Sequence, residues 1–126
     1  MDNDRKTIIM VDDDITNLTV ARNNLSGEYN IFTVPSGEKL LKLLEKITPA
    51  LILLDIEMPE MNGYMVLEKL KSGGKTANIP VIFMTAKTNA DDESTGLKMG
   101  AVDYITKPFS RELLIDRINM HITADK

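Results

Sequence analysis

Five short apolar segments alternate with segments of helical periodicity along the chain, and this alternation limits the fold more than any other feature. The apolar segments are 7–11, 30–34, 51–54, 81–84 and 102–105. The predicted helices are 15–25, 37–47, 63–71, 91–99 and 111–122. The first, third and fourth apolar segments carry apolar residues on both faces of an extended strand. This pattern is typical of a parallel sheet covered by helices on both sides.

We therefore predict an α/β fold built on a five-stranded parallel sheet. Right-handed crossovers and short connections leave few strand orders for such a chain. The order 2-1-3-4-5 puts the most apolar strands in the middle and the weaker second strand at an edge. The result is a flavodoxin-like three-layer (βα)5 sandwich. We expect one domain over residues 1–126, with residues 1–6 and 123–126 frayed.

Composition excludes several classes of site. The 126 residues include no cysteine and one histidine, so thiolate nucleophiles, disulfides and multi-histidine metal sites are excluded. A net charge of -4 argues against a general nucleic-acid-binding face. No apolar run approaches the roughly 20 residues of a membrane span, and no signal-peptide pattern opens the chain. We expect a cytoplasmic protein that binds neither nucleic acid nor membrane directly.

Polar side chains follow four of the predicted strands at the point where each strand ends. Asp12 and Asp13 follow the first strand, and Asp55 follows the third. Thr85 ends the fourth strand, and Lys107 follows the fifth. The carboxyl ends of parallel strands lie at one edge of a sheet, where ligands of such folds bind. A single aspartate there would be a plausible cap, but this convergence predicts a functional site.

Three neighbouring carboxylates would raise each other's pKa unless a cation joins them. A hard divalent cation with oxygen ligands fits this set, and Mg²⁺ is the abundant one. With Mg²⁺ and Lys107 the site is close to neutral, so an anionic phosphoryl group can be accommodated. Asp55 is the central carboxylate and is the candidate nucleophile for an aspartyl phosphate.

Four segments in this order resemble the receiver domains of two-component response regulators. They are Val11-Asp12-Asp13, residues 54–63, Met84-Thr85-Ala86 and residues 104–109. The resemblance covers essentially the whole chain. It implies that Asp55 accepts a phosphoryl group from a histidine of a separate kinase or phosphotransfer protein.

The resemblance also implies the roles of the surrounding residues. Asp13, Asp55 and the backbone carbonyl of Glu57 would bind Mg²⁺ directly, and Asp12 would act mostly through a metal-bound water. Pro59 and Gly63 would shape the loop that presents that carbonyl.

Other implied roles concern the phosphoryl group and the response to it. Thr85 and Lys107 would contact phosphoryl oxygens, and the bond from Lys107 to Pro108 would be cis. Movement of Thr85 would let the ring of Tyr104 turn inward, which would change the surface of the fourth helix, fifth strand and fifth helix.

Three further interpretations concern charged residues. Glu57 and Lys87 are expected to modulate the lifetime of the phosphorylated state, and we hypothesise that they pair above the site. Asp14 is expected to be a helix N-cap. His121 is expected to be a solvated residue of the last helix.

Two alternatives stay open. An aspartate-nucleophile phosphatase of the haloacid-dehalogenase type uses similar groups, but there the nucleophile follows the first strand. A receiver-fold binding module that works without phosphorylation is the other alternative. Otherwise the protein is a signalling switch and not an enzyme acting on other molecules.

The sequence does not indicate which protein or domain this signalling switch would act on. The chain could be a stand-alone receiver acting on an effector protein, or a receiver taken from a regulator with a fused output domain. Val102 replaces the first acid of a Gly-Ala-Asp-Asp-Tyr pattern that many DNA-binding regulators carry. This weakens the case for a charged dimer face without excluding a phosphorylation-linked homodimer.

Overall fold

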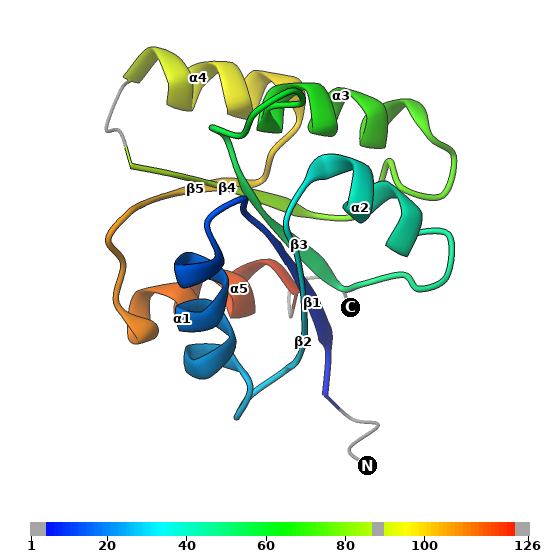
Figure 1. The fold of residues 1–126 in the computed structure, drawn as a ribbon. Coiled ribbons are helices and arrows are strands. Elements are labelled where there is room, and N and C mark those ends of the chain that lie inside the picture. Colours follow the sequence, from blue (N-terminus) through cyan, green and yellow to red (C-terminus); the bar gives the residue numbers. More distant parts are fainter. Residues whose placement is uncertain (1–4, 87–89, 123–126) are drawn as a thin grey trace.

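The structure is a computed structural model that describes residues 5–86 and 90–122. Within these residues, five strands alternate with five helices (Figure 1). The strands are β1 (Thr7–Val11), β2 (Asn30–Val34), β3 (Leu51–Asp55), β4 (Val81–Thr85) and β5 (Asp103–Thr106). The helices are α1 (Ile15–Leu25), α2 (Gly37–Leu43), α3 (Gly63–Ser72), α4 (Ala90–Met99) and α5 (Arg111–Ile122).

All strand pairs are parallel, and the sheet order is β2-β1-β3-β4-β5. This confirms the predicted fold class and strand order. Every residue of β3 and β4 is buried, whereas all five residues of the edge strand β2 are at least partly accessible. A strand that is apolar on both faces therefore lies in the middle of the sheet, where helices cover both of its sides.

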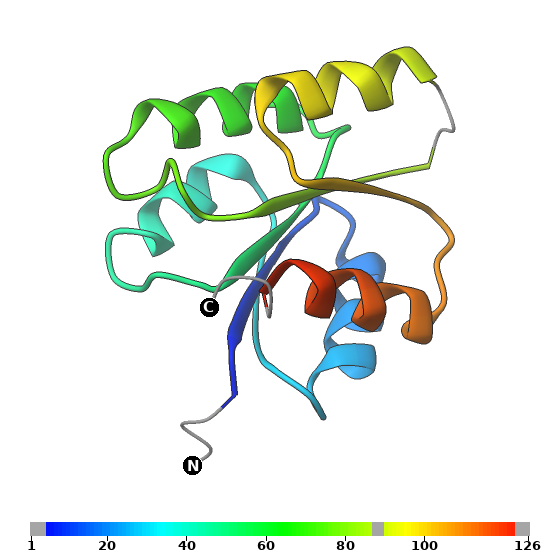
Figure 2. The same ribbon diagram turned by 180° about the vertical axis from the view of Figure 1, so that it is seen from behind.

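The helices form two layers around the sheet. Helices α1 and α5 cover one face, and α2, α3 and α4 cover the other (Figures 1 and 2). The core divides accordingly into two clusters, because alternate side chains of each strand point to opposite faces. Ile52 and Leu54 pack on the α2–α3–α4 side, while Leu51 and Leu53 pack on the α1–α5 side.

Helix starts follow the side-chain caps that the sequence contains. The carboxylate of Asp14 accepts a hydrogen bond from the amide of Thr16, and Ser36 accepts one from the amide of Lys39. Ser110 accepts a hydrogen bond from the amide of Leu113 at the start of α5. Each cap satisfies an amide that has no partner within its helix, and the predicted cap at Asp14 is confirmed.

One helix is shorter than predicted. Helix α2 ends at Leu43, whereas the apolar pattern predicted a helix to Ile47. The amides of Glu45 and Lys46 bond to carbonyls three residues earlier, so the last turn tightens. The apolar spacing continues through this turn, so periodicity alone did not indicate where helix α2 ends.

The beginning of the described chain is held in place. The amide of Asn30 donates to the carbonyl of Lys6 at 2.9 Å, and the guanidinium of Arg5 donates to the carbonyl of Ser26. These bonds connect Arg5 and Lys6 to the start of β2 and the end of α1, and the expectation that residues 1–6 and 123–126 are frayed stays a prediction. Residues 1–4 and 123–126 lie outside the described residues. No helix in the described part of the chain is long and apolar enough to cross a membrane.

Candidate functional site

Strand register brings the distant aspartates together. Val11 of β1 is paired with Leu54 of β3, so the next residues, Asp12 and Asp55, lie side by side. Asp55 is in turn paired with Met84 of β4. Residues separated by more than forty positions in sequence thus meet because parallel strands end at the same edge of the sheet.

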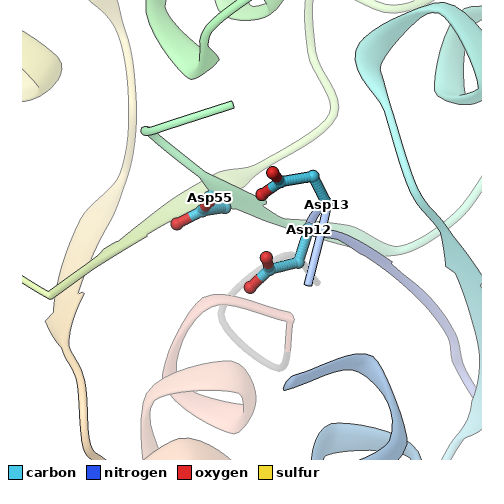
Figure 3. A group of neighbouring side chains, drawn as sticks. All are labelled: Asp12, Asp13 and Asp55. Carbon is cyan, nitrogen blue, oxygen red and sulfur yellow. The ribbon is translucent and has the colours of Figure 1, made fainter. Parts of the chain in front are cut away.

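Asp12, Asp13 and Asp55 form an acidic cluster. Each offers one carboxylate oxygen, and these three oxygens lie within 4.8 Å of one another (Figure 3). Asp12 and Asp55 are buried, with 1% and 4% of their surface exposed, whereas Asp13 is exposed. The cluster therefore has two buried carboxylates and one side open to solvent.

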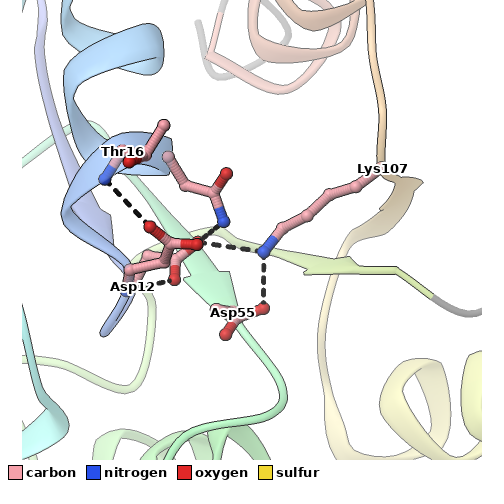
Figure 4. A network of polar contacts seen from close by, with 6 residues as sticks. Asp12, Thr16, Asp55 and Lys107 are labelled. Atoms are coloured by element: carbon pink, nitrogen blue, oxygen red, sulfur yellow. Dashed lines mark hydrogen bonds and ion pairs between the residues drawn. The ribbon is translucent and has the colours of Figure 1, made fainter.

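Lys107 is the cation of this cluster. Its ammonium nitrogen lies 2.9 Å from Oδ2 of Asp12 and 3.0 Å from Oδ1 of Asp55 (Figure 4). The amide of Lys107 donates to the carbonyl of Thr85 at 2.7 Å, which fixes where the side chain begins. The peptide bond between Lys107 and Pro108 is cis, as the resemblance implied.

Asp12 is held by further donors. Its Oδ1 accepts a hydrogen bond from the amide of Asp14 at 2.9 Å, and its Oδ2 accepts one from the side-chain amide of Asn17 at 3.1 Å. Together with Lys107, these donors stabilise the ionised carboxylate. Sequence reasoning missed Asn17. Its position in the first turns of α1, on the helix that begins after the acidic run, was the available signal.

Burial dominates the electrostatics of Asp55. It raises the pKa of the carboxyl from 3.8 to about 6, and the charge of Asp12 adds to this rise. The hydrogen bond from Lys107 opposes the rise without cancelling it. Burial alone would lower the pKa of Lys107, but its hydrogen bonds to Asp12 and Asp55 outweigh this effect, and its pKa is raised. Lys107 therefore stays protonated, whereas burial destabilises the ionised form of Asp55.

This cluster fits a hard divalent cation. All its ligand atoms are carboxylate oxygens, which suit Mg²⁺, Ca²⁺ or Mn²⁺ and not softer metals. A cation would also relieve the repulsion between Asp12 and Asp55 that contributes to the raised pKa of Asp55. The exposed carboxylate of Asp13 gives the ion an approach from solvent.

Thr85 and Tyr104 lie beside the cluster on neighbouring strands. Thr85 is 1% exposed at the end of β4, and Tyr104 is 8% exposed in β5. Phe83 is paired with Tyr104, and both belong to the core cluster under α2, α3 and α4. Thr85 comes two residues after Phe83, so strand alternation directs it to the same face. Tyr104 is thus a buried member of this core cluster.

Comparison with known proteins decides the family. Residues 8–119 match the sequence profile described as the response regulator receiver domain. The chain belongs to this family.

Two curated relatives of this receiver domain are much longer than it is. It is 43% identical to a "Probable cyclic di-GMP phosphodiesterase" of Vibrio cholerae, over 92% of this chain and 26% of that protein. It is 38% identical to the "Probable transcriptional regulator ycf27" of Porphyra purpurea, over 100% of this chain and 51% of that protein. The receiver domain thus spans about half of one relative and a quarter of the other.

A solved structure supports both the fold and the family. The receiver domain of the sensor histidine kinase PA1611 from Pseudomonas aeruginosa superposes with a TM-score of 0.86 at 27% identity. The match covers 94% of this chain and 98% of that chain. That receiver has a magnesium ion coordinated in its active site cleft.

The loop after Asp55 is tightly folded in this receiver domain. The amide of Gly63 donates to the carbonyl of Ile56 at 2.8 Å. A Cβ on Gly63 would lie 2.6 Å from the carbonyl oxygen of Asp55, so only glycine fits there. Glu60 has a φ of 68°, in the left-handed region that few non-glycine residues adopt. Glu57 is exposed in this loop, and Lys87 lies outside the described residues, so their pairing stays a prediction.

The expectation for His121 is wrong. Its Nε2 lies 2.8 Å from Oδ2 of Asp103, and its side chain is 20% exposed. Arg117 contacts the other oxygen of Asp103 at 2.8 Å. One carboxylate of β5 therefore bonds two basic side chains of α5. Helical periodicity puts Arg117 and His121 on one face, but only the tertiary fold places Asp103 beneath them.

Proposed function

We propose that this receiver domain is a phosphorylation-dependent signalling switch. Asp55 accepts a phosphoryl group from a histidine of a partner kinase or phosphotransfer protein, with Mg²⁺ as the cofactor. The output is a changed surface of α4, β5 and α5. That surface acts on an effector protein or on a fused output domain.

The observation that carries this proposal is the cluster of Asp12, Asp13 and Asp55 with Lys107 bonded to two of its members. A structural ion pair needs one carboxylate for one lysine. Here three carboxylates are gathered around one ammonium, and burial holds the pKa of the central one at about 6. Retaining an excess of buried negative charge is costly to folding, and such clusters are characteristic of functional sites.

Asp13, Asp55 and the backbone carbonyl of Glu57 would hold the magnesium ion. Asp12 is better suited to support the ion than to bind it, because three donors already bond to its carboxylate. Bound Mg²⁺ would neutralise charge on the carboxylates and on the incoming phosphoryl group.

The transfer itself uses Asp55 and Lys107. An oxygen of Asp55 attacks phosphorus in line with the histidine nitrogen, so a P–O bond forms as the P–N bond breaks. The histidine leaves with the electron pair of that bond. The ammonium of Lys107 is 3.0 Å from Oδ1 of Asp55, so it can pass to a phosphoryl oxygen with little movement.

Thr85 and Tyr104 would link phosphorylation to the surface. The hydroxyl of Thr85 would donate a hydrogen bond to a phosphoryl oxygen, and its movement would favour the inward position of Tyr104. The low exposure of Tyr104, 8%, supports an inward position of the ring that is populated without the phosphoryl group. Phosphorylation would then shift a population that already exists.

Mass spectrometry after incubation with acetyl phosphate and MgCl₂ tests the proposal. We expect a mass increase of one phosphoryl group in the wild-type chain, and none in Asp55→Asn or when EDTA is present. A Ser72→Ala variant is the matched control, because Ser72 lies at the far end of α3 and its hydroxyl donates to the carbonyl of Lys69.

Three outcomes would contradict the proposal. Incorporation that survives Asp55→Asn would place the phosphoryl group elsewhere. Absence of incorporation in the wild type, with both acetyl phosphate and a phosphohistidine donor, would favour a binding module without phosphorylation. Continuous hydrolysis of p-nitrophenyl phosphate that depends on Asp55 would favour a phosphatase.

A further inference from the structure

A second polar cavity lies at the opposite end of the sheet from Asp55. It has a volume of about 290 Å³ and lies between the starts of β1, β3 and β4 and the end of α5. Lys6 precedes β1, Pro80 precedes β4, and Ile122 ends α5. Because the strands are parallel, this cavity is separated from the acidic cluster by the full length of the sheet.

Basic and uncharged polar side chains line this cavity. Lys6 and Lys75 contribute ammonium groups, His121 an imidazole, Asn78 an amide and Thr48 a hydroxyl. Among the residues that the structure describes, no aspartate or glutamate lines it. Among residues 5–86 and 90–122, neither Lys6 nor Lys75 forms an ion pair with a carboxylate. Two lysines therefore line one small cavity that has no carboxylate among its described lining residues.

The floor of the cavity is apolar and held by the sheet. Ile79 and Ile122 are 6% and 8% exposed, and Pro49 is buried beside them. The amide of Ala50 donates to the carbonyl of Thr7, which ties the start of β3 to the start of β1. The carbonyl of Pro80 accepts from Ile52, which ties β4 to β3. The cavity is therefore formed without a ligand.

Two acidic residues of the described chain, Asp103 and Glu45, lie near this cavity without forming an ion pair with its lysines. Asp103 bonds His121, but it also bonds Arg117, so its single negative charge is shared between two basic side chains. Glu45 lines an adjacent cavity with Lys75 and forms no ion pair with it. Among the described residues that line this cavity the charged groups are basic, in contrast to the acidic cluster at the other end of the sheet.

We propose that this cavity binds a small anion that bears a phosphate group and a short apolar part. Lysine ammonium groups bind phosphate as point charges, and the amide of Asn78 and hydroxyl of Thr48 can donate hydrogen bonds to the same oxygens. Two ammonium groups suit a doubly charged phosphate better than a monocarboxylate. The apolar floor of Ile79 and Pro49 suits a small hydrocarbon group. This site is independent of the phosphoacceptor site proposed above.

Titration of the ¹⁵N-labelled full chain by NMR tests this site. Phenyl phosphate, inorganic phosphate and benzoate are added separately at constant ionic strength, with EDTA present so that the acidic cluster holds no metal. We expect saturable amide shifts at Lys6, Asn78 and Ile79 with phenyl phosphate. Inorganic phosphate should bind more weakly because it lacks the apolar part, and benzoate should bind more weakly because it carries one charge.

Two double variants of equal net charge separate a specific site from general attraction. Lys6→Gln with Lys75→Gln should raise the dissociation constant of phenyl phosphate about tenfold, through loss of two charge-assisted hydrogen bonds. Lys39→Gln with Lys98→Gln removes two exposed lysines elsewhere and should leave it unchanged. All four lysines are exposed, so both variants should keep the wild-type unfolding midpoint.

The proposal is wrong if phenyl phosphate gives no saturable shift at these amides. It is also wrong if the two double variants weaken binding equally, because that result indicates attraction by net charge alone. Equal affinity for benzoate and phenyl phosphate would overturn the preference for phosphate. None of these results depends on whether Asp55 is phosphorylated.

Discussion

The ammonium nitrogen of Lys107 lies 3.0 Å from Oδ1 of Asp55, across 52 positions of sequence. The same nitrogen lies 2.9 Å from Oδ2 of Asp12. A single lysine thus bonds both buried carboxylates of the acidic cluster. It stabilises two like charges in the absence of a metal, and it competes electrostatically with any cation that binds them.

Replacing Lys107 with methionine should therefore separate metal binding from phosphoryl transfer. Removing the ammonium leaves the carboxylates without their counter-charge, so Mg²⁺ should bind about tenfold more tightly. The rate of phosphorylation by acetyl phosphate at saturating Mg²⁺ should fall about tenfold or more, because the phosphoryl oxygens lose a cation. Isothermal titration calorimetry and intact mass measure the two effects. As a control, Lys107→Arg keeps the charge and should keep the wild-type affinity for Mg²⁺. Weaker Mg²⁺ binding in Lys107→Met would contradict the proposed competition between Lys107 and the cation.

The raised pKa of Asp55 predicts a loss of stability as pH rises. Its pKa is 3.8 ordinarily and about 6 in the folded chain, so the folded state holds this proton more tightly than the unfolded state. The resulting contribution is fully present below pH 3.8 and is lost as pH rises through 6. The shift corresponds to about 2–3 kcal/mol of the free energy of unfolding.

Urea denaturation in EDTA between pH 4 and pH 7.5 measures this contribution by difference from Asp55→Asn. The amide carries no charge, so the variant should gain about 2–3 kcal/mol over the wild type across that range. Groups that do not interact with Asp55 contribute equally to both chains and cancel in the difference. Adding Mg²⁺ should reduce the difference, because the cation stabilises the charged carboxylate of the wild type. A difference that does not change with pH would contradict the raised pKa.

Asn17 should support the acidic cluster through Asp12. Its side-chain amide donates to Oδ2 of Asp12 at 3.1 Å, and Asp12 is 1% exposed. Asn17→Ala removes a donor to a buried carboxylate, which should lower the free energy of unfolding by about 1–2 kcal/mol. Asn24→Ala, later on the same helix, removes a side chain of the same kind away from the cluster. Equal losses in both variants, measured by urea denaturation, would show that the bond to Asp12 contributes nothing.

Gly96 lets helix α4 approach the sheet. A Cβ at this position would lie 2.6 Å from Cδ2 and 2.8 Å from Cε2 of Phe83, whose side chain is fully buried. Gly96→Ala should therefore destabilise the chain by about 1–2 kcal/mol, although alanine is the better helix former. Thermal unfolding measures the change. Gly74→Ala meets no atom within 4 Å and should be nearly neutral, so a neutral Gly96→Ala would show that α4 shifts freely over Phe83.

Local patterns were sufficient to predict the elements and their order. The apolar runs of β3 and β4 showed that these strands are buried on both faces, and Asp14 was recognisable as a cap. Such features depend on residues close in sequence. The end of α2 was not predictable, because its apolar spacing continues into a turn held by backbone bonds three residues apart.

The convergence of Asp12, Asp55, Thr85 and Lys107 at one end of the sheet also followed from sequence, once the strand order was inferred. A parallel sheet places all strand ends at one edge, so the topology alone brings these residues near each other.

Only the tertiary structure decided which atoms meet. It showed that Lys107 bonds both Asp12 and Asp55, that Asn17 supports Asp12, and that Tyr104 is buried. It also paired His121 with Asp103 and formed a cavity between Lys6 and Lys75. Each of these depends on the distance and direction between side chains of different elements. Those quantities are set by how helices pack on the sheet, and one-dimensional periodicity carries no information about them.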